Sequence, residues 1–228
     1  MPKRIVVAFL ILLVLTPAAI LLINEIRLGR NLESQRESSS AEIREYDGKR
    51  LSSIRDFREN SIKGPQKVDI STYRLSIVGL VTNPGDFTYG EVLEKHERHR
   101  EVLTLDCVEG WSVTLLWEGV LVKDLLKEAS PLPNAKVVII HAVDGYTTSL
   151  PLDYVLEKDA MLAYKMNDVI LPAERGHPFQ LTANGKWGYK WIKWVAKIEL
   201  SEDVNYRGFW ESRGYSNDGD LDKPFLGA

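Results

Sequence analysis

The side chain with the clearest capacity for chemistry is the thiol of Cys107, the single cysteine of the sequence. It lies in the stretch LTLDCVEGW (103–111), at the end of an apolar run. Three interpretations are open. A lone cysteine often packs as a small buried hydrophobe, its thiolate can attack a substrate if a histidine base is close, or it can bind a soft metal. His141 and His177 are candidate bases, and the sequence does not show whether either lies near Cys107.

Lysines and aromatic residues alternate in a second stretch that could do chemistry, GKWGYKWIKWVAKIEL (185–200). The alternating residues are Lys186, Lys190 and Lys193 with Trp187, Tyr189, Trp191 and Trp194. This pattern fits an amphipathic strand with solvated lysines, a surface for single-stranded nucleic acid, or a pocket in which ammonium groups bind a phosphate beside aromatic walls. Because the sequence has a net charge of −3, we expect a pocket for one small anionic cofactor and no nucleic-acid partner.

Five stretches of the sequence resemble the molybdopterin-binding domain of the sulfite oxidase superfamily, in the same order and spacing. They are CVEGWSVTLLWEGVLVKDLL, DGYTTSLPL, MLAYKMND, GHPFQLTANGKWGYKWIKWVAKIEL and GFWESRGYS. The resemblance covers roughly residues 60–217 and points to compact prokaryotic members, similar to the catalytic subunit of periplasmic protein-methionine-sulfoxide reductase. It implies an oxidoreductase with a molybdenum–molybdopterin cofactor, with or without an attached nucleotide. Such an enzyme would transfer an oxygen atom to or from a small oxyanion or a sulfoxide.

The resemblance implies a role for each matching residue. Cys107 matches the cysteine that ligates molybdenum and is therefore the catalytic and metal-binding candidate. Asn60 and Lys63 fall where the family's N-terminal segment folds over the pterin, and Trp187 and Tyr189 are implied as walls of the pterin pocket. The remaining candidate cofactor contacts are Ala142, Arg175, Gln180, Lys190, Trp191, Ile192 and Lys193, the last four on the phosphate side.

Three of these positions depart from the family pattern. Ala142 stands in place of a threonine, so only its backbone could contact the cofactor. Arg175 aligns with an asparagine and could bind a phosphate bidentately. Gln180 stands where arginine is usual, which removes a fixed positive charge and weakens the case for an anionic substrate such as sulfite. The departures keep open an alternative, a non-catalytic binding module that retains the fold but lacks cofactor or activity.

The N-terminus of the sequence predicts attachment to a membrane. The run Ile5–Ile23 carries no charge and, at about 19 residues, is long enough to span the hydrocarbon core as a helix. A cleaved signal has a shorter apolar region, so we expect residues 1–24 to be a retained transmembrane signal anchor, with a cleaved signal as the alternative. Two basic residues precede the run and two follow it, which leaves the orientation open. We expect the domain after the anchor to be extracytoplasmic.

Composition separates a stalk from a domain after the anchor. Residues 25–59 are rich in Glu, Arg and Ser and predict a charged stalk, whereas residues 60–228 form the globular domain. Strands are expected at 73–81, 101–107, 112–117, 136–142, 178–183 and 192–200, and short helices after the cap Thr88, at 121–127 and from Pro151. Many strands with scattered short helices predict an α+β fold, and the resemblance implies a mixed sheet of the sulfite oxidase type.

The sequence also bears on redox partners. It contains no C-x-x-C-H haem motif and no cysteine set for an iron–sulfur cluster, so electrons must be exchanged with a separate protein. We expect a cytochrome or quinone-linked membrane partner, near which the anchor would hold the domain. The dimerisation domain of the family's eukaryotic members is not found in the sequence, and a monomer is the expectation.

Overall fold

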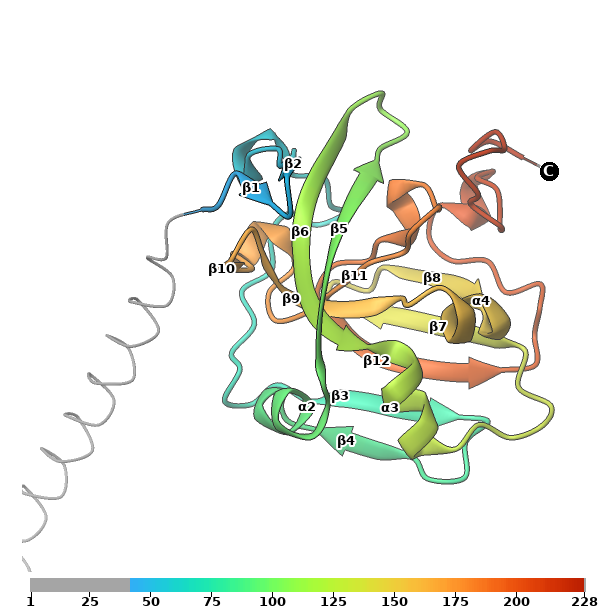
Figure 1. Cartoon of the computed structure of the whole chain (residues 1–228). Coiled ribbons are helices and arrows are strands. Elements are labelled where there is room, and N and C mark those ends of the chain that lie inside the picture. Colours follow the sequence, from blue (N-terminus) through green and yellow to red (C-terminus); the bar gives the residue numbers. More distant parts are fainter. Residues whose placement is uncertain (1–41, 228) are drawn as a thin grey trace, which may run out of the picture. The chain divides into compact units, whose positions relative to one another are not determined.

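The computed structural model describes residues 42–227 and shows an α+β fold built on two larger sheets (Figure 1). The first sheet contains β5 (Arg98–Asp106), β6 (Ser112–Leu121), β9 (Met161–Met166), β10 (Val169–Ile170) and β11 (Gln180–Leu181). The second contains β3 (Leu75–Gly79), β4 (Gly85–Phe87), β7 (Val137–Ala142), β8 (Thr147–Pro151) and β12 (Val195–Ser201). The order is β10-β9-β6-β5 in the first sheet, where β11 also pairs with β9, and β4-β3-β12-β7-β8 in the second.

The second sheet is mixed, because β12 runs parallel to β3 while its other pairings are antiparallel. The predicted mixed-sheet α+β class is therefore confirmed. Shorter elements complete the described part of the chain. They are the hairpin β1 (Glu45–Tyr46) and β2 (Lys49–Arg50), the helices α2 (Tyr89–Lys95), α3 (Val122–Ala129) and α4 (Leu152–Glu157), and the 3-10 turns η1 (Ile54–Asp56), η2 (Ala173–Arg175), η3 (Gly188–Lys190) and η4 (Glu211–Arg213).

The long hairpin of β5 and β6 presents Cys107 at its tip. Alternate residues of β5 face the core, with Leu103 and Leu105 buried, and β5 pairs with β6 from Arg98 to Asp106. The turn is closed by backbone hydrogen bonds from Cys107 N to the carbonyl oxygen of Trp111 (2.9 Å) and from Gly110 N to that of Cys107 (3.0 Å). Cys107 is thus fixed at the end of a regular strand.

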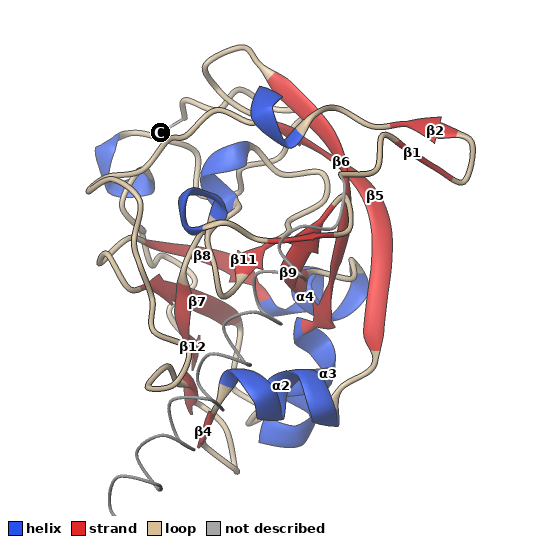
Figure 2. Cartoon of the chain, turned by 90° about the vertical axis from the view of Figure 1, so that its left-hand side faces the viewer, coloured by secondary structure: helices blue, strands red, loops and turns tan. Residues whose placement is uncertain are grey.

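Helices α2 and α3 cover the opposite end of the sheets from this turn. Figures 1 and 2 both place α2 and α3 at the end away from the β5–β6 turn. Thr88 caps α2 as predicted, with its side chain accepting from Glu91 N and the Glu91 carboxylate accepting from Thr88 N. Helices α2 and α3 therefore pack at one end of the sheets, whereas loops lie at the end that carries the β5–β6 turn.

One hydrophobic core joins the two sheets. It contains Leu75, Ile77 and Ile140 of the second sheet together with Leu115 and Trp117 of the first, all with at most 1% of their surface exposed. Interiors of this kind are close-packed, so they hold the strand ends in fixed positions. Loops that leave those strand ends start from a rigid base.

One predicted strand requires correction, and one strand was not predicted. The strand expected at 192–200 begins only at Val195, because Trp194 has φ = 52° in the left-handed region, which interrupts an extended chain. Strand β9, central to the first sheet, was not predicted. Its residues are nearly all buried, so they lack the alternation that marks a half-exposed strand.

The predicted stalk is wrong for residues 42–59. These residues belong to the same compact unit as the rest of the described domain. Leu51 and Phe57 are only 5% and 4% exposed, and the Glu42 carboxylate accepts hydrogen bonds from Ile54 N and from the Asn167 side chain. The many charges of this stretch concealed the two apolar side chains that insert into the core.

The predicted transmembrane anchor and the remainder of the predicted stalk fall on residues 1–41, outside the described residues. Within residues 42–227, no helix has both the length and the apolar character that crossing a membrane requires.

Candidate active site

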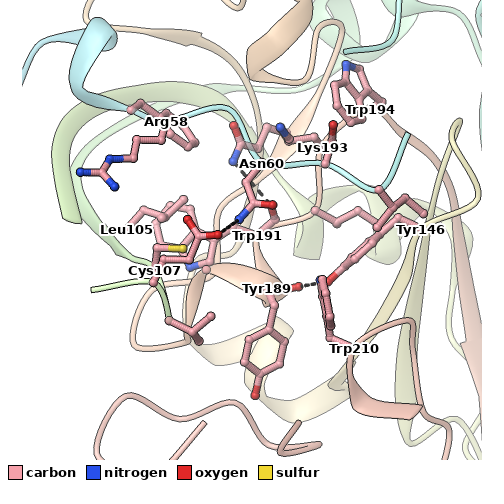
Figure 3. A pocket seen from close by; sticks show the side chains of 18 of the residues that line it. Arg58, Asn60, Leu105, Cys107, Tyr146, Tyr189, Trp191, Lys193, Trp194 and Trp210 are labelled. Atoms are coloured by element: carbon pink, nitrogen blue, oxygen red, sulfur yellow. Dashed lines mark hydrogen bonds between the residues drawn. The ribbon is translucent and has the colours of Figure 1, made fainter. Parts of the chain in front are cut away.

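A cavity of about 250 Å³ lies beside the end of β5 (Figure 3). Its walls come from residues 57–62, the β5–β6 turn, the loop after β7, residues 188–194, and the C-terminal residues Trp210 and Tyr215. Segments far apart in the sequence therefore meet there. Gly188 allows this approach, because a Cβ atom at Gly188 would lie 3.2 Å from the carbonyl oxygen of Asp106 and 3.5 Å from Cα of Cys107. The two stretches singled out for chemistry are thus in direct contact.

Cys107 lines this cavity and is half-buried. Burial raises the pKa of its thiol, and the negative charge of Glu109 acts in the same direction. Glu109 is itself held by the Asn60 Nδ2 atom and the Trp111 Nε1 atom, each 3.0 Å from one of its carboxylate oxygens. An ordinary or raised pKa does not activate a free thiol as a nucleophile, whereas a soft metal would displace its proton.

Among the described residues, no histidine lines the cavity. His141 bonds to the Glu199 carboxylate at 2.9 Å on the second sheet, and His177 packs against Tyr89. The interpretation of Cys107 as a nucleophile therefore lacks its base. The same part of the chain contains no cluster of three or more His, Cys, Asp or Glu side chains that could hold a metal, so a metal bound to Cys107 would need ligands from a cofactor.

Lys193 lines the same cavity. Figure 3 shows Asn60 between the Cys107 sulfur and the Lys193 ammonium. The Lys193 Nζ atom lies 2.9 Å from Oε1 of Glu59 and donates to the carbonyl oxygen of Glu174 at 3.3 Å. Burial lowers the pKa of Lys193 despite the bond to Glu59. A soft donor and a basic group therefore share the cavity.

Two buried side chains near Lys193 have polar atoms without a protein partner in the described part of the chain. Gln180 lines the cavity and is 1% exposed; its Nε2 atom contacts the Trp191 carbonyl oxygen at 3.5 Å, but its Oε1 atom has no partner. Arg175 does not line the cavity, and its guanidinium lies 4.8 Å from the Phe57 ring. Its Nε and Nη1 atoms have no partner. Buried polar groups are normally satisfied, so a ligand that donates a hydrogen bond to Gln180 Oε1 would fit this wall of the cavity.

The other predicted contacts divide into two groups. Trp191 and Ile192 are buried and line the cavity. Ala142 and Lys63 do not line it; the Ala142 N atom bonds to the Tyr146 carbonyl oxygen, and the Lys63 ammonium lies near Gly145 of the same turn. They therefore support the turn that carries the cavity residues Asp144 and Tyr146.

Lys190 forms a buried ion pair outside the cavity. Its side chain is fully buried, with Nζ 2.7 Å from Oε1 of Glu211, whose side chain is also fully buried, and 3.0 Å from the carbonyl oxygen of Ser149. Lys190 was predicted to hold the phosphate, but its ammonium does not line the cavity that contains Lys193. Trp187 is likewise outside the lining and packs on Phe225 instead.

Sequence reasoning missed part of the aromatic wall. Trp210 and Tyr215, from the stretch GFWESRGYS, line the cavity beside Tyr189, with the Tyr189 and Tyr215 rings 5.1 Å apart. The Tyr146 hydroxyl donates to the Tyr189 carbonyl oxygen at 2.6 Å. The density of aromatic residues in the stretch was a usable signal, but it also fits a packed edge.

Comparison with known proteins adds independent findings. The family model "Oxidoreductase molybdopterin binding domain" matches residues 62–210. "Uncharacterized oxidoreductase YuiH" from Bacillus subtilis is 34% identical over 157 residues, which cover 68% of this chain and 78% of that protein. "Putative protein-methionine-sulfoxide reductase subunit YedZ1" from Azospira oryzae is 30% identical over 151 residues, which cover 66% of this chain and 57% of that protein.

A solved structure is also similar. The sulfane dehydrogenase SoxCD from Paracoccus pantotrophus superimposes with a TM-score of 0.62 and 26% sequence identity, covering 70% of this chain and 44% of that chain. This chain therefore spans less than two thirds of YedZ1 and of the SoxCD chain.

Proposed function

Because the chain belongs to the oxidoreductase molybdopterin-binding domain family, it is a molybdopterin-dependent oxidoreductase, and we propose that its reaction is oxygen-atom transfer on a small sulfoxide or oxyanion. The observation that carries the proposal is the presence of the Cys107 thiol and the Lys193 ammonium in one cavity. When bound, the molybdenum–molybdopterin cofactor supplies the oxygen-atom transfer and the change in oxidation state. The donor set fits the group, since a thiolate suits the soft metal and buried cations suit an anionic tail.

The protein's own residues would bind and orient the cofactor and shield the cavity from solvent. Cys107 would ligate the metal. The hydrogen bond from Asn60 to Glu109 holds the segment 57–62, which forms one wall of the cavity, beside Cys107. Lys193 would bind the anionic tail at the other side of the cavity. The rings of Trp191 and Tyr189 form apolar walls that exclude water from the space between.

We favour a sulfoxide over an oxyanion as the substrate class. The basic side chains in the cavity lining are Arg58 and Lys193, and Gln180 is neutral. Most of the remaining lining is aromatic or aliphatic, which suits an apolar substrate with one polar oxygen. The name of the relative YedZ1, a putative protein-methionine-sulfoxide reductase subunit, supports the same class.

We further propose that electrons come from a separate membrane-bound redox protein, and that the apolar run Ile5–Ile23 anchors the domain outside the cytoplasm near it. The absence of haem and iron–sulfur motifs from the sequence supports a separate donor. Protease treatment of intact and lysed spheroplasts tests the location: protection only in intact cells would contradict it.

Metal analysis tests the function directly. Protein made in a cofactor-competent host should contain near-stoichiometric molybdenum and fluorescent pterin, and it should reduce a sulfoxide with a reduced dye as donor. Cys107→Ser should stay folded, because the side chain faces a cavity, and should lose turnover by at least about 100-fold. A folded, metal-free wild-type protein would favour a non-catalytic binding module instead, and an active Cys107→Ser variant would refute the ligand role.

A further inference from the structure

The ammonium of Lys193 is in contact with two environments. Lys193 lines the cavity, and its Nζ atom is 2.9 Å from Oε1 of Glu59, which does not line the cavity. The Lys193 side chain is 9% exposed, whereas that of Glu59 is 34% exposed. The ion pair thus has a buried basic end and a partly solvated acidic end. An anion inside the cavity and the carboxylate of Glu59 would bind the same ammonium.

The backbone that carries Glu59 is fixed independently of this ion pair. All residues of the segment 57–62 except Glu59 line the cavity. Phe57 is buried, with its ring centroid 5.7 Å from that of Trp111 and 6.2 Å from that of Trp117. Asn60 is held by its bond to Glu109. The Glu59 side chain can therefore turn into solvent while the segment stays in place.

A second buried cation lies in the same group of charges. Arg175 is 8% exposed, and its Nε and Nη1 atoms have no hydrogen-bond partner in the described part of the chain. Its charge acts on Lys193 and on Glu59. The other acidic side chains of this group are Glu174, which acts on Arg175, and Asp144, which acts on Lys193. The positive charge of Arg175 beside Lys193 makes the Lys193 side of the cavity a suitable place for a phosphate group, although Arg175 itself does not line the cavity.

We propose that Glu59 is an internal competitor for the phosphate group of the cofactor, which displaces the Glu59 carboxylate from Lys193 when it binds. The inference rests on the proposed function, because it takes the anion at Lys193 to be the tail of molybdopterin. In this arrangement Glu59 neutralises Lys193 whenever no phosphate is bound there, and it weakens the hold of the protein on the phosphate. Glu59 thereby sets how readily the cofactor is retained or released.

Phosphate binding to cofactor-free full-length protein tests the competition. Glu59→Gln keeps the side-chain shape and removes the charge. We expect this variant to bind inorganic phosphate about tenfold more tightly than the wild type, a difference of ~1.4 kcal/mol in binding free energy, measured by calorimetry. Lys193→Met should abolish binding. Glu157→Gln, at an exposed carboxylate at the end of α4, is the matched control and should leave the affinity unchanged. Equal affinities of wild type and Glu59→Gln, or an equal gain in Glu157→Gln, would overturn the proposal.

Cofactor-loaded protein identifies the anion. The loaded wild type should bind no phosphate at this site, and loaded Glu59→Gln should release pterin about tenfold more slowly on dilution, measured by pterin fluorescence. Glu59-dependent phosphate binding that persists in the loaded protein would overturn the assignment to the cofactor and assign the site to an oxyanion substrate. If no host yields molybdenum-containing protein, the proposed function fails, whereas a tenfold gain in Glu59→Gln still supports competition at Lys193.

Discussion

A fully buried ion pair supports the aromatic side of the cavity. Lys190 and Glu211 are both 0% exposed, and Oε1 of Glu211 also accepts from the Thr148 hydroxyl at 2.5 Å. Their neighbours Tyr189 and Trp210 line the cavity. Burial lowers the pKa of Lys190, and the bond to Glu211 opposes this effect. The pair therefore holds η3, β8 and η4 together by charge rather than by apolar contact.

Removal of one member of this pair should cost far more than removal of both. Lys190→Met leaves the Glu211 carboxylate buried without its counter-ion, and we expect it to lower the free energy of unfolding by about 3–5 kcal/mol. The double variant Lys190→Met/Glu211→Gln should recover more than half of that loss. Denaturant unfolding of the wild type, both single variants and the double variant gives the coupling energy. Strictly additive losses would show that the two side chains do not act as a pair.

Lys190 and Lys193 show that the residue type and its place in the sequence do not determine which side chains reach the cavity. Both lysines were predicted to bind phosphate, and they are three positions apart in one stretch. Their side chains enter different surroundings because η3 ends at Lys190, after which the chain turns through Trp191. The partner of Lys190, Glu211, lies in the stretch GFWESRGYS, in which no site residue was predicted. No spacing in the sequence pairs these residues, whereas the position of Cys107 at a strand end followed directly from the apolar run before it.

At the scale of elements, strands β6 and β9 approach so closely at Gly119 that any side chain there would clash with the backbone of β9. Gly119 lies in β6 where the register with β9 shifts, and a Cβ atom there would lie 2.4 Å from the Leu162 carbonyl oxygen and 2.7 Å from Cα of Ala163. Both are backbone atoms, which cannot move without separating the strands. Because β6 carries the turn with Cys107, the position of that turn depends on this contact.

Gly119→Ala should therefore destabilise the protein by about 1–3 kcal/mol or more, the usual cost of overpacking a well-packed interior. Gly90→Ala is the matched control, since Gly90 lies in α2 and a Cβ atom there would meet nothing within 4 Å. It should leave stability unchanged or raise it by about 0.5–1 kcal/mol, because alanine is the better helix former. Thermal unfolding of both variants checks the prediction. Equal melting temperatures for the two would contradict it.

Elements with a periodic pattern, a cap or a run of β-branched residues such as that at 136–142 were predictable, and elements without such a local signal were not. The cap Thr88 and the alternation in residues 101–107 predicted α2 and the C-terminal half of β5. Strand β9 is as buried as β7, but its sequence MLAYKM contains no β-branched residue, so it lacks the composition that marks VVIIHA as a strand. The left-handed φ of Trp194 arises from tertiary contacts, including the bond from its Nε1 atom to the Ala173 carbonyl oxygen at 2.7 Å. No local pattern in the sequence announces such a contact.

At the scale of the whole molecule, His177 connects the helix end to the cavity side. It stacks near Tyr89 of α2, with ring centroids 6.0 Å apart, and lies three residues before the cavity residue Gln180. Its Nδ1 atom is buried and has no hydrogen-bond partner within residues 42–227. Burial lowers the pKa of His177. The folded state therefore favours the neutral ring, whereas the unfolded chain protonates near the ordinary histidine pKa of about 6.5.

Global stability should consequently fall as the pH decreases from 7 to 5. Below the unfolded pKa the unfolded state binds more protons than the folded state, which favours unfolding until the lowered folded pKa is reached. His177→Gln removes this contribution and should flatten the pH dependence. Part of the slope should remain, because burial also lowers the pKa of His141. Urea unfolding of the wild type and His177→Gln at pH 5, 6 and 7 measures both slopes, and parallel slopes would show that the protonation of His177 is not linked to folding.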